Sequence, residues 1–148
     1  MLNIKKTITK ILTGMTTKAG TFTPTQGGMT NALNVHQYGD IVTINGYLNN
    51  VTLTTNSNTN IGSISNVDVP TEPVRFICSV GSNAYTMGTH SYGTVTKTGV
   101  IEITSSAGGS GKALFFTATY NACTTLGGVI SRIKYAITNL FREGVMAC

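Results

Sequence analysis

The stretch IVTINGYLNNVTLTT, residues 41–55, decides the fold class because apolar and polar residues alternate along its first half. One side of an extended chain would carry Val42, Ile44 and Gly46, and the other would carry Thr43, Asn45 and Tyr47. Most of the other residues in the stretch are β-branched or polar and uncharged, which suits a half-buried strand. The stretch therefore predicts a strand with one face on a core.

Similar short runs, separated by glycine and proline, extend this pattern over most of the chain. They are AGTFTPT (19–25), ALNVHQY (32–38), NIGSI (60–64), PVRFICSV (73–80), AYTMGTH (84–90), TVTKTGVIEIT (94–104) and ALFFTATY (113–120). Within residues 94–104, Lys97, Thr98 and Gly99 predict a hairpin turn. About eight strands at this spacing predict a mainly β protein, an antiparallel β-sandwich or jelly roll, over residues 18–122.

Length and charge limit the classes of protein that the chain can belong to. Its 148 residues suit one domain, and only 10% of them are charged. The net charge is +5, but the basic residues gather near the two ends and form no stripe with aromatic residues between them. We therefore expect no nucleic-acid partner. No run approaches the ~18 apolar residues of a membrane span, and lysines interrupt the apolar residues of MLNIKKTITKILTGM (1–15), so we also expect no export signal.

The cysteines predict neither a metal site nor a set of internal disulfides. Three cysteines cannot all pair within one chain, and Cys78, Cys123 and Cys148 show no spacing typical of zinc ligands. Cys78 lies in an apolar run, where a reduced thiol behaves as a small hydrophobic side chain. We expect reduced structural thiols in a protein made in a cytoplasm, and no cofactor.

The first segment, residues 1–17, predicts a short helix. Its apolar residues recur at intervals of four, three and four, which gives one helical stripe: Ile4, Ile8, Ile11 and Met15. Isoleucine at such positions favours coiled coils of three or four strands, so the segment could be the stub of an oligomeric stalk. The alternative is one amphipathic helix packed on its own domain.

The last segment, residues 123–148, predicts an amphipathic helix over 124–143. Its apolar stripe comprises Leu126, Val129, Ile130, Ile133, Ile137, Leu140 and Phe141. We expect Leu126, Ile130, Ile133, Ile137 and Leu140 to be buried against a partner, a neighbouring subunit or the chain's own domain. A helix lying on a membrane surface is a weaker alternative, because the segment has a thin charged face and no tryptophan.

The candidates for catalysis are weak. Asp68 and Glu72 lie in one loop and could be a glycosidase pair, but two solvated acids beside prolines explain them as well. His36, His90 and Asp40 have no spacing typical of a metal site or a catalytic triad. The segment SSAGGSGKA (105–113) lacks the order of a phosphate-binding loop and predicts a flexible hairpin loop. We therefore predict that the protein is not an enzyme.

The segment GSNAYTMGTHSYG (81–93) is the best candidate for a ligand-binding surface. Saccharide binding needs an aromatic platform with a few polar groups, and Asn83, Tyr85, His90 and Tyr92 supply both. The alternative is a tyrosine-rich hairpin that packs on a neighbouring subunit.

Residues 34–121 resemble the C-terminal head domains of tail-fibre and baseplate receptor-binding proteins from phages of Gram-positive hosts. The stretches that carry the resemblance are NVHQYGDIVTINGYLNNVTLT (34–54), NIGSISNVDVPTEPVRFICSV (60–80), GTVTKTGVIEITSSAGG (93–109) and ALFFTATYN (113–121). The positions that match the family pattern are Gly39, Val42, Ile44 and Gly46; Ile61, Gly62, Ile64 and Pro73; Gly99, Ile101 and Ile103; and Phe115 or Phe116 with Tyr120. Members of that family commonly stop soon after the closing strand, whereas this chain adds the segment 124–143.

The resemblance implies a jelly-roll head that assembles as a homotrimer and contacts host-surface saccharide. It also implies a virion component at the tail tip, made in the bacterial cytoplasm, with other tail proteins as partners. Two alternatives remain open at this point. One is a tail enzyme that degrades envelope saccharide, and the other is a secreted, non-viral trimeric ligand of the tumour-necrosis-factor-like type.

Overall fold

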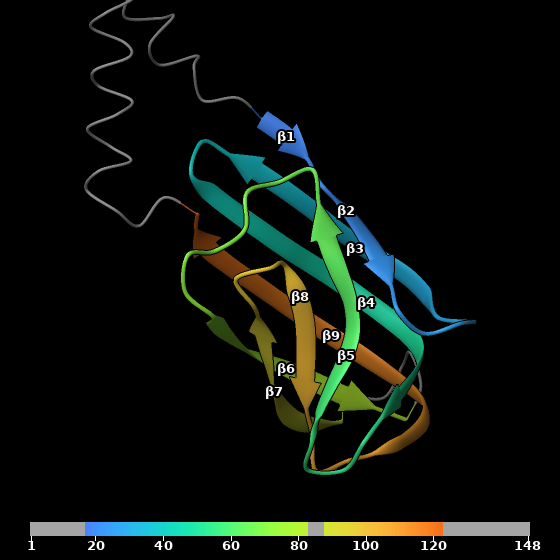
Figure 1. The fold of residues 1–148 in the computed structure, drawn as a ribbon. Helices are drawn as coiled ribbons and strands as arrows, with labels where there is room; N and C mark the ends of the chain where they lie inside the picture. The colour runs from blue at the N-terminus through green and yellow to red at the C-terminus, as the bar shows by residue number, and fades with distance from the viewer. Residues whose placement is uncertain (1–16, 83–87, 123–148) are drawn as a thin grey trace, which may run out of the picture.

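The described part of the protein is built almost entirely from β-strands (Figure 1). The computed structural model describes residues 17–82 and 88–122, and these contain nine strands and no helix. The strands are β1 (Thr17–Ala19), β2 (Thr21–Pro24), β3 (Thr30–Tyr38), β4 (Ile41–Leu53), β5 (Asn58–Ser65), β6 (Val74–Gly81), β7 (Thr89–Val95), β8 (Val100–Thr104) and β9 (Gly109–Asn121). The prediction of a mainly β fold is therefore confirmed.

All nine strands belong to one antiparallel sheet in the order β1-β3-β4-β9-β6-β7-β8-β5-β2. Strands that follow one another in sequence pair in the hairpins β3–β4, β6–β7 and β7–β8. The last strand, β9, instead lies in the middle of the sheet between β4 and β6. The antiparallel pairing was predicted from the sequence. The joining of all nine strands in one nearly closed sheet was not. We call this sheet the barrel.

The N-terminal strands almost close the barrel. β1 pairs with β3 near one edge of the sheet, and β2 pairs with β5 at the other edge. Gly20 lies between β1 and β2, and its N–H donates to Val35 O at 2.8 Å. A side chain at position 20 would come within 2.5 Å of Val35 and 2.9 Å of Val67. Glycine is needed here because the chain passes this close to its neighbours as it changes from one edge to the other.

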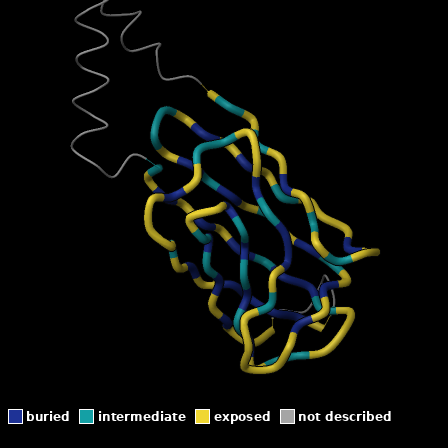
Figure 2. The backbone as a smooth tube through the Cα atoms, in the orientation of Figure 1, coloured by how far each residue is buried: buried dark blue, intermediate teal, exposed yellow. Residues whose placement is uncertain are grey.

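The core lies inside the barrel and is made largely by alternate residues along the strands, as the colours along the tube show (Figure 2). In β4, Val42, Ile44 and Leu48 are fully buried, and the residues between them are not. The alternation predicted for residues 41–48 is therefore confirmed. The core also holds the stacked rings of Phe76 and Phe116, whose centroids are 4.8 Å apart. Apolar burial of this kind is the main source of stability, at about 25 cal/mol per Å² removed from water.

The β7–β8 hairpin turn is confirmed at the predicted residues. Gly99 has a φ of +78°, a conformation that glycine adopts without strain, and its N–H donates to Thr96 O at 3.0 Å. Two other predictions were wrong in detail. Residues 105–113 are not wholly a loop, because β9 begins at Gly109 and its pairing with β4 extends the sheet there. The break expected between the runs 84–90 and 94–104 is absent, because Thr89–Val95 form a single strand, β7, which pairs with β6. Residues 84–87 of the first run lie outside the described residues.

The two predicted helices fall outside the described residues. The stripe Ile4, Ile8, Ile11 and Met15 belongs to residues 1–16, and the helix over 124–143 belongs to residues 123–148. Both therefore stay predictions. In the part of the chain that the structure describes, no helix has the length and apolar character needed to cross a membrane.

Candidate functional site

The described members of the predicted ligand-binding surface lie side by side on β7. His90 and Tyr92 are exposed and point outward, whereas Ser91 and Gly93 between and after them point into the barrel. A Cβ atom at Gly93 would lie 2.0 Å from the ring of Phe76. The ring therefore leaves room only for glycine at this position. The other two predicted members, Asn83 and Tyr85, lie outside the described residues.

Tyr92 is paired with a second exposed apolar residue that the sequence analysis missed. Ile77 on β6 lies directly opposite Tyr92, and each of the two is 67% exposed. Residues directly opposite in an antiparallel pair have Cβ atoms about 4.5–5.5 Å apart, so the two side chains can touch. Ile77 stands in an apolar run, and only the strand register shows that it faces outward while Phe76 and Cys78 face inward.

A row of residues beside this pair runs across four strands, and its β6 member, Ser79, is buried. Tyr47, Phe115, Ser79 and His90 are successive partners on β4, β9, β6 and β7. The rings of Tyr47 and Phe115 are stacked with their centroids 5.9 Å apart. We define the aromatic face as Tyr47, Ile77, His90, Tyr92 and Phe115. Three of its members, Tyr47, Ile77 and Tyr92, are among the exposed large apolar residues of the described chain.

Polar side chains adjoin the aromatic face on β8 and β5, on the side of Tyr92 away from Ile77. Thr104 on β8 lies opposite Tyr92, and Asn58 on β5 lies opposite Thr104. The Thr104 hydroxyl donates to Asn58 Oδ1, and Asn58 Nδ2 donates to Glu102 Oε2 at 3.4 Å. We call Asn58, Glu102 and Thr104 the polar ladder. Sequence reasoning missed it because Asn58 and Thr104 are 46 residues apart in the chain. They are brought together only by the pairing of β5 with β8.

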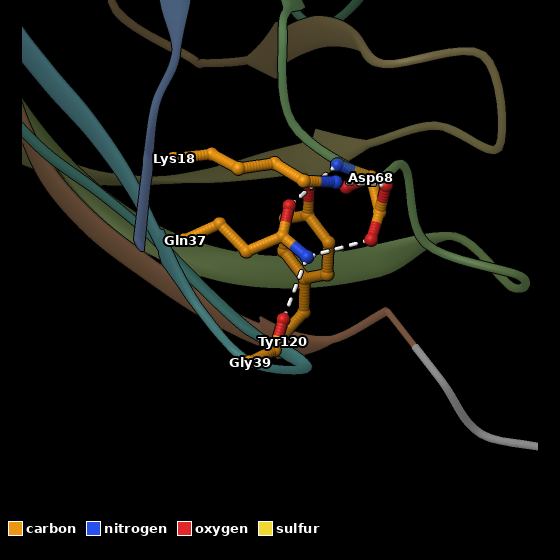
Figure 3. A network of polar contacts seen from close by, with 5 residues as sticks. All are labelled: Lys18, Gln37, Gly39, Asp68 and Tyr120. Atoms are coloured by element: carbon orange, nitrogen blue, oxygen red, sulfur yellow. Dashed lines mark hydrogen bonds and ion pairs between the residues drawn. The ribbon is translucent and has the colours of Figure 1, made fainter. Parts of the chain in front are cut away.

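A second polar cluster lies at one end of the barrel (Figure 3). Gln37 Nε2 donates to Asp68 Oδ2 at 2.6 Å and to Gly39 O at 2.7 Å, and Gln37 Oε1 accepts the Asp68 N–H at 2.8 Å. Lys18 Nζ lies 2.8 Å from Asp68 Oδ1, and the Tyr120 hydroxyl donates to Asp68 O at 2.8 Å. We call these five residues the Asp68 network. It joins β1, β3, β9 and the loop between β5 and β6.

The Asp68 network has the properties of a structural connection. Gln37 is buried, and both ends of its amide are satisfied, as buried polar groups must be. Burial, and next the negative charge of Asp68, raise the pKa of Tyr120 to about 12, so this phenol stays protonated and keeps donating. Asp68 is a partly solvated loop acid, with its side chain 46% exposed, and Lys18 and Gln37 also hold it in place.

The other residues considered for chemistry are not brought together. Glu72 pairs with Lys97 at 2.9 Å on the surface, while Asp68 is held by Lys18 and Gln37. His36 and His90 lie on β3 and β7, which are separated by three strands. Among residues 17–82 and 88–122, no group of three or more histidines, cysteines or acids could hold a metal ion.

Cys78 lies in the core as a free thiol, as the apolar run around it predicted. Burial raises its pKa to about 11, which keeps it protonated and unreactive at neutral pH.

Comparison with known proteins adds no relative to this description. No model of a known protein family matches the sequence, and no curated protein matches it either. The aromatic face and the polar ladder are therefore interpreted from their own geometry.

Proposed function

We propose that the protein is a non-enzymatic binding head of a phage tail tip, which contacts saccharide on the host surface and assembles as a homotrimer. The observation that carries this proposal is the aromatic face with the polar ladder beside it. The jelly-roll assignment is part of the proposal. It is supported by the antiparallel order in which β9 returns between β4 and β6.

The exposed pair Ile77 and Tyr92 supports a binding role because folding does not account for it. Each side chain leaves most of its surface in water, although the inward positions of the same strands are filled by apolar residues. Exposed apolar residues that lie together on a polar surface typically mark an interaction site. Single exposed apolar residues carry no such meaning, so the direct pairing of the two matters.

The chemistry of the surface favours saccharide as the ligand. A sugar ring presents an apolar face that can pack on an aromatic ring, while its hydroxyl groups both donate and accept hydrogen bonds. Tyr92 supplies an exposed ring, and the amide of Asn58 and the carboxylate of Glu102 supply a donor and acceptors next to it. The low density of charge on the surrounding rows suits a neutral ligand.

The acids of the described chain support binding over cleavage. A glycosidase needs two carboxyl groups on opposite sides of one glycosidic bond. Asp68 and Glu72, the acids that share a loop, are each engaged by a lysine, and Asp68 is also held by Gln37. The polar ladder contains one carboxylate, that of Glu102.

The saccharide proposal is tested with two variants of the surface and a matched control. Tyr92→Ala and Asn58→Ala should each weaken binding to an array of bacterial surface saccharides by about tenfold, or ~1.4 kcal/mol. Val69→Ala is the control, because Val69 is an exposed apolar residue in the loop between β5 and β6 and lies outside the aromatic face. If both surface variants bind the same saccharides as strongly as the unaltered protein, the proposed site is wrong.

The trimer is tested by light scattering on the unaltered protein at micromolar concentration. Three chains of 15.6 kDa are expected in each particle. A stable monomer would contradict the trimer. If Tyr92→Ala changes the mass of the assembly and leaves saccharide binding intact, the aromatic face is a subunit interface instead.

A further inference from the structure

The first and the last described strands, β1 and β9, each contribute a residue to the same row at one end of the barrel. Thr17 on β1 lies opposite Tyr38 on β3, Tyr38 lies opposite Ile41 on β4, and Ile41 lies opposite Asn121 on β9. The order of these residues across the sheet is therefore Thr17, Tyr38, Ile41 and Asn121. Residues 1–16 precede the first position of this row, and residues 123–148 follow closely after the last.

The two middle residues of this row form an exposed apolar pair. Tyr38 is 59% exposed and Ile41 is 52% exposed, and they lie directly opposite each other beside the β3–β4 turn. The next outward row on the same strands is polar, with His36, Thr43 and Thr119 as successive partners. The apolar pair is thus confined to the end of the barrel where the chain leaves the sheet.

The chain is fixed beside this pair at the point where the described residues end. The N–H of Ala122 donates to Asp40 O in the β3–β4 turn at 2.8 Å, and Ala122 packs partly against the core. This bond sets Ala122, the last described residue, next to the turn that Tyr38 and Ile41 flank. Residues 123–148, which include the seven-residue apolar stripe predicted from sequence, therefore begin next to an exposed apolar surface.

We propose that the start of the segment 124–143 docks on its own barrel and covers Tyr38 and Ile41 with Leu126, Val129 and Ile130. The distances allow this, since Leu126 is five residues beyond Asn121 and neighbouring strands are about 4.8 Å apart. Positions 126, 129 and 130 lie on one face of a helix, so they can meet the pair together. This inference is independent of saccharide binding and of the trimer.

The C-terminal segment suits this surface better than the N-terminal segment does. It adjoins Ile41 through β9 and is held at the β3–β4 turn by Ala122, whereas β1 adjoins only Tyr38. Its stripe has seven apolar residues, against four in residues 1–16, where Lys5, Lys6 and Lys10 flank the stripe. Burying apolar side chains is favourable in proportion to the area removed from water, which favours the segment that can bury more of them.

Disulfide cross-linking in the full chain tests the docking. Cys123→Ser and Cys148→Ser remove the cysteines near the segment, and Ile41→Cys is then combined in turn with Cys at 126, 129, 130, 128 or 131. Docking is expected to give cross-links from the apolar positions 126, 129 and 130, and few from 128 and 131 on the opposite face. The cross-linked product should run as a single chain on a denaturing gel without reductant. If Ile41→Cys lowers the melting temperature, the same series is made with Tyr38→Cys in its place.

The control series replaces Ser106 with cysteine instead of Ile41. Ser106 is exposed in the loop after β8, next to the bridge between Thr55 and Ser105 at the far end of β4. It should give no cross-link with any of the five positions. Products of twice the chain mass would show that a second copy covers the pair and would overturn the proposal. Equal cross-linking at all five positions, or none at any, would overturn it too, as would cross-links from Ile41→Cys to Cys introduced at Met15 alone.

Discussion

The Asp68 network and the aromatic face use similar side chains in opposite ways. Tyr120, in the network, is 5% exposed and donates its hydroxyl to the backbone of Asp68. Tyr92, on the aromatic face, is 67% exposed and lies beside Ile77. The same residue type is therefore buried and hydrogen-bonded within the fold in one place and leaves most of its ring in water in the other.

This difference suggests a way to separate residues that hold the fold together from residues that are free to bind a partner. A polar or aromatic side chain whose hydrogen bonds join several strands is accounted for by stability, as Gln37 and Asp68 are. An exposed side chain that adds little to the core, such as Ile77, needs another explanation. Substitutions in the two regions should accordingly differ in what they affect, and the predictions below test this in order of expected effect.

The largest effect is expected from Gln37→Leu. Leucine has a similar volume but leaves Gly39 O, the Asp68 N–H and Asp68 Oδ2 without the buried amide that now bonds them. Unsatisfied groups of this kind cost about 1–3 kcal/mol each, and water can reach part of Asp68, so we expect a loss of about 2–4 kcal/mol. Urea unfolding at neutral pH measures it.

Gln26→Leu is the matched control for that prediction. Gln26 makes a similar pair of bonds, donating to Thr52 O at 2.9 Å and accepting the Thr52 N–H at 2.8 Å, but at a solvent-exposed place. Water can replace these bonds, so the loss should stay below about 1 kcal/mol. Equal losses for the two variants would show that burial does not distinguish the Asp68 network.

A smaller effect, which depends on pH, is expected from Tyr120→Phe. At neutral pH the variant should lose about 1 kcal/mol because Asp68 O loses its donor. The pKa of Tyr120 is raised from 10.0 to about 12 in the folded protein, so the unfolded chain releases this proton at lower pH than the folded chain. The stability that the protonated hydroxyl contributes is therefore complete below pH 10 and is lost as the pH rises through 12.

Urea unfolding over this range measures the pH effect. Stability should fall less steeply with pH above about 10 in Tyr120→Phe than in the unaltered protein. The same slope for Tyr120→Phe and the unaltered protein would contradict the role given to Tyr120.

The smallest effect on stability is expected from Ile77→Thr and Tyr92→Ala. Both side chains are largely exposed, so their loss should change the free energy of unfolding by less than about 0.5 kcal/mol. Threonine keeps the β-branched shape that strands favour. Binding to the saccharide array should nevertheless fall for Tyr92→Ala. A large loss of stability in either variant would place these residues with the fold instead of the ligand.

The local sequence pattern predicted strand faces and turns correctly where residue type and spacing alone determine them. The alternation along residues 41–48 gave the buried face of β4, and the turn residues Lys97–Gly99 gave the β7–β8 hairpin. Prediction failed where a strand's limits depend on its partner. Gly109 and its neighbours look like a loop in sequence, yet they are extended because β4 reaches far enough to pair with them. On the candidate site, His90 and Tyr92 were proposed from their residue types, whereas Ile77, Asn58 and Thr104 enter only through the strand pairing.

The sequence by itself determined the β class, the inward face of the long strand and the chemical types available for a site, because these follow from local periodicity and from side-chain chemistry. Only the tertiary structure decided which strands are neighbours, and hence that Tyr92 meets Ile77 and Thr104, and that Gln37 meets Asp68. The physical reason is that sheet pairing joins residues far apart in the chain through backbone groups that are the same in every residue. Register therefore depends on how the whole core packs, and no single stretch of sequence records it.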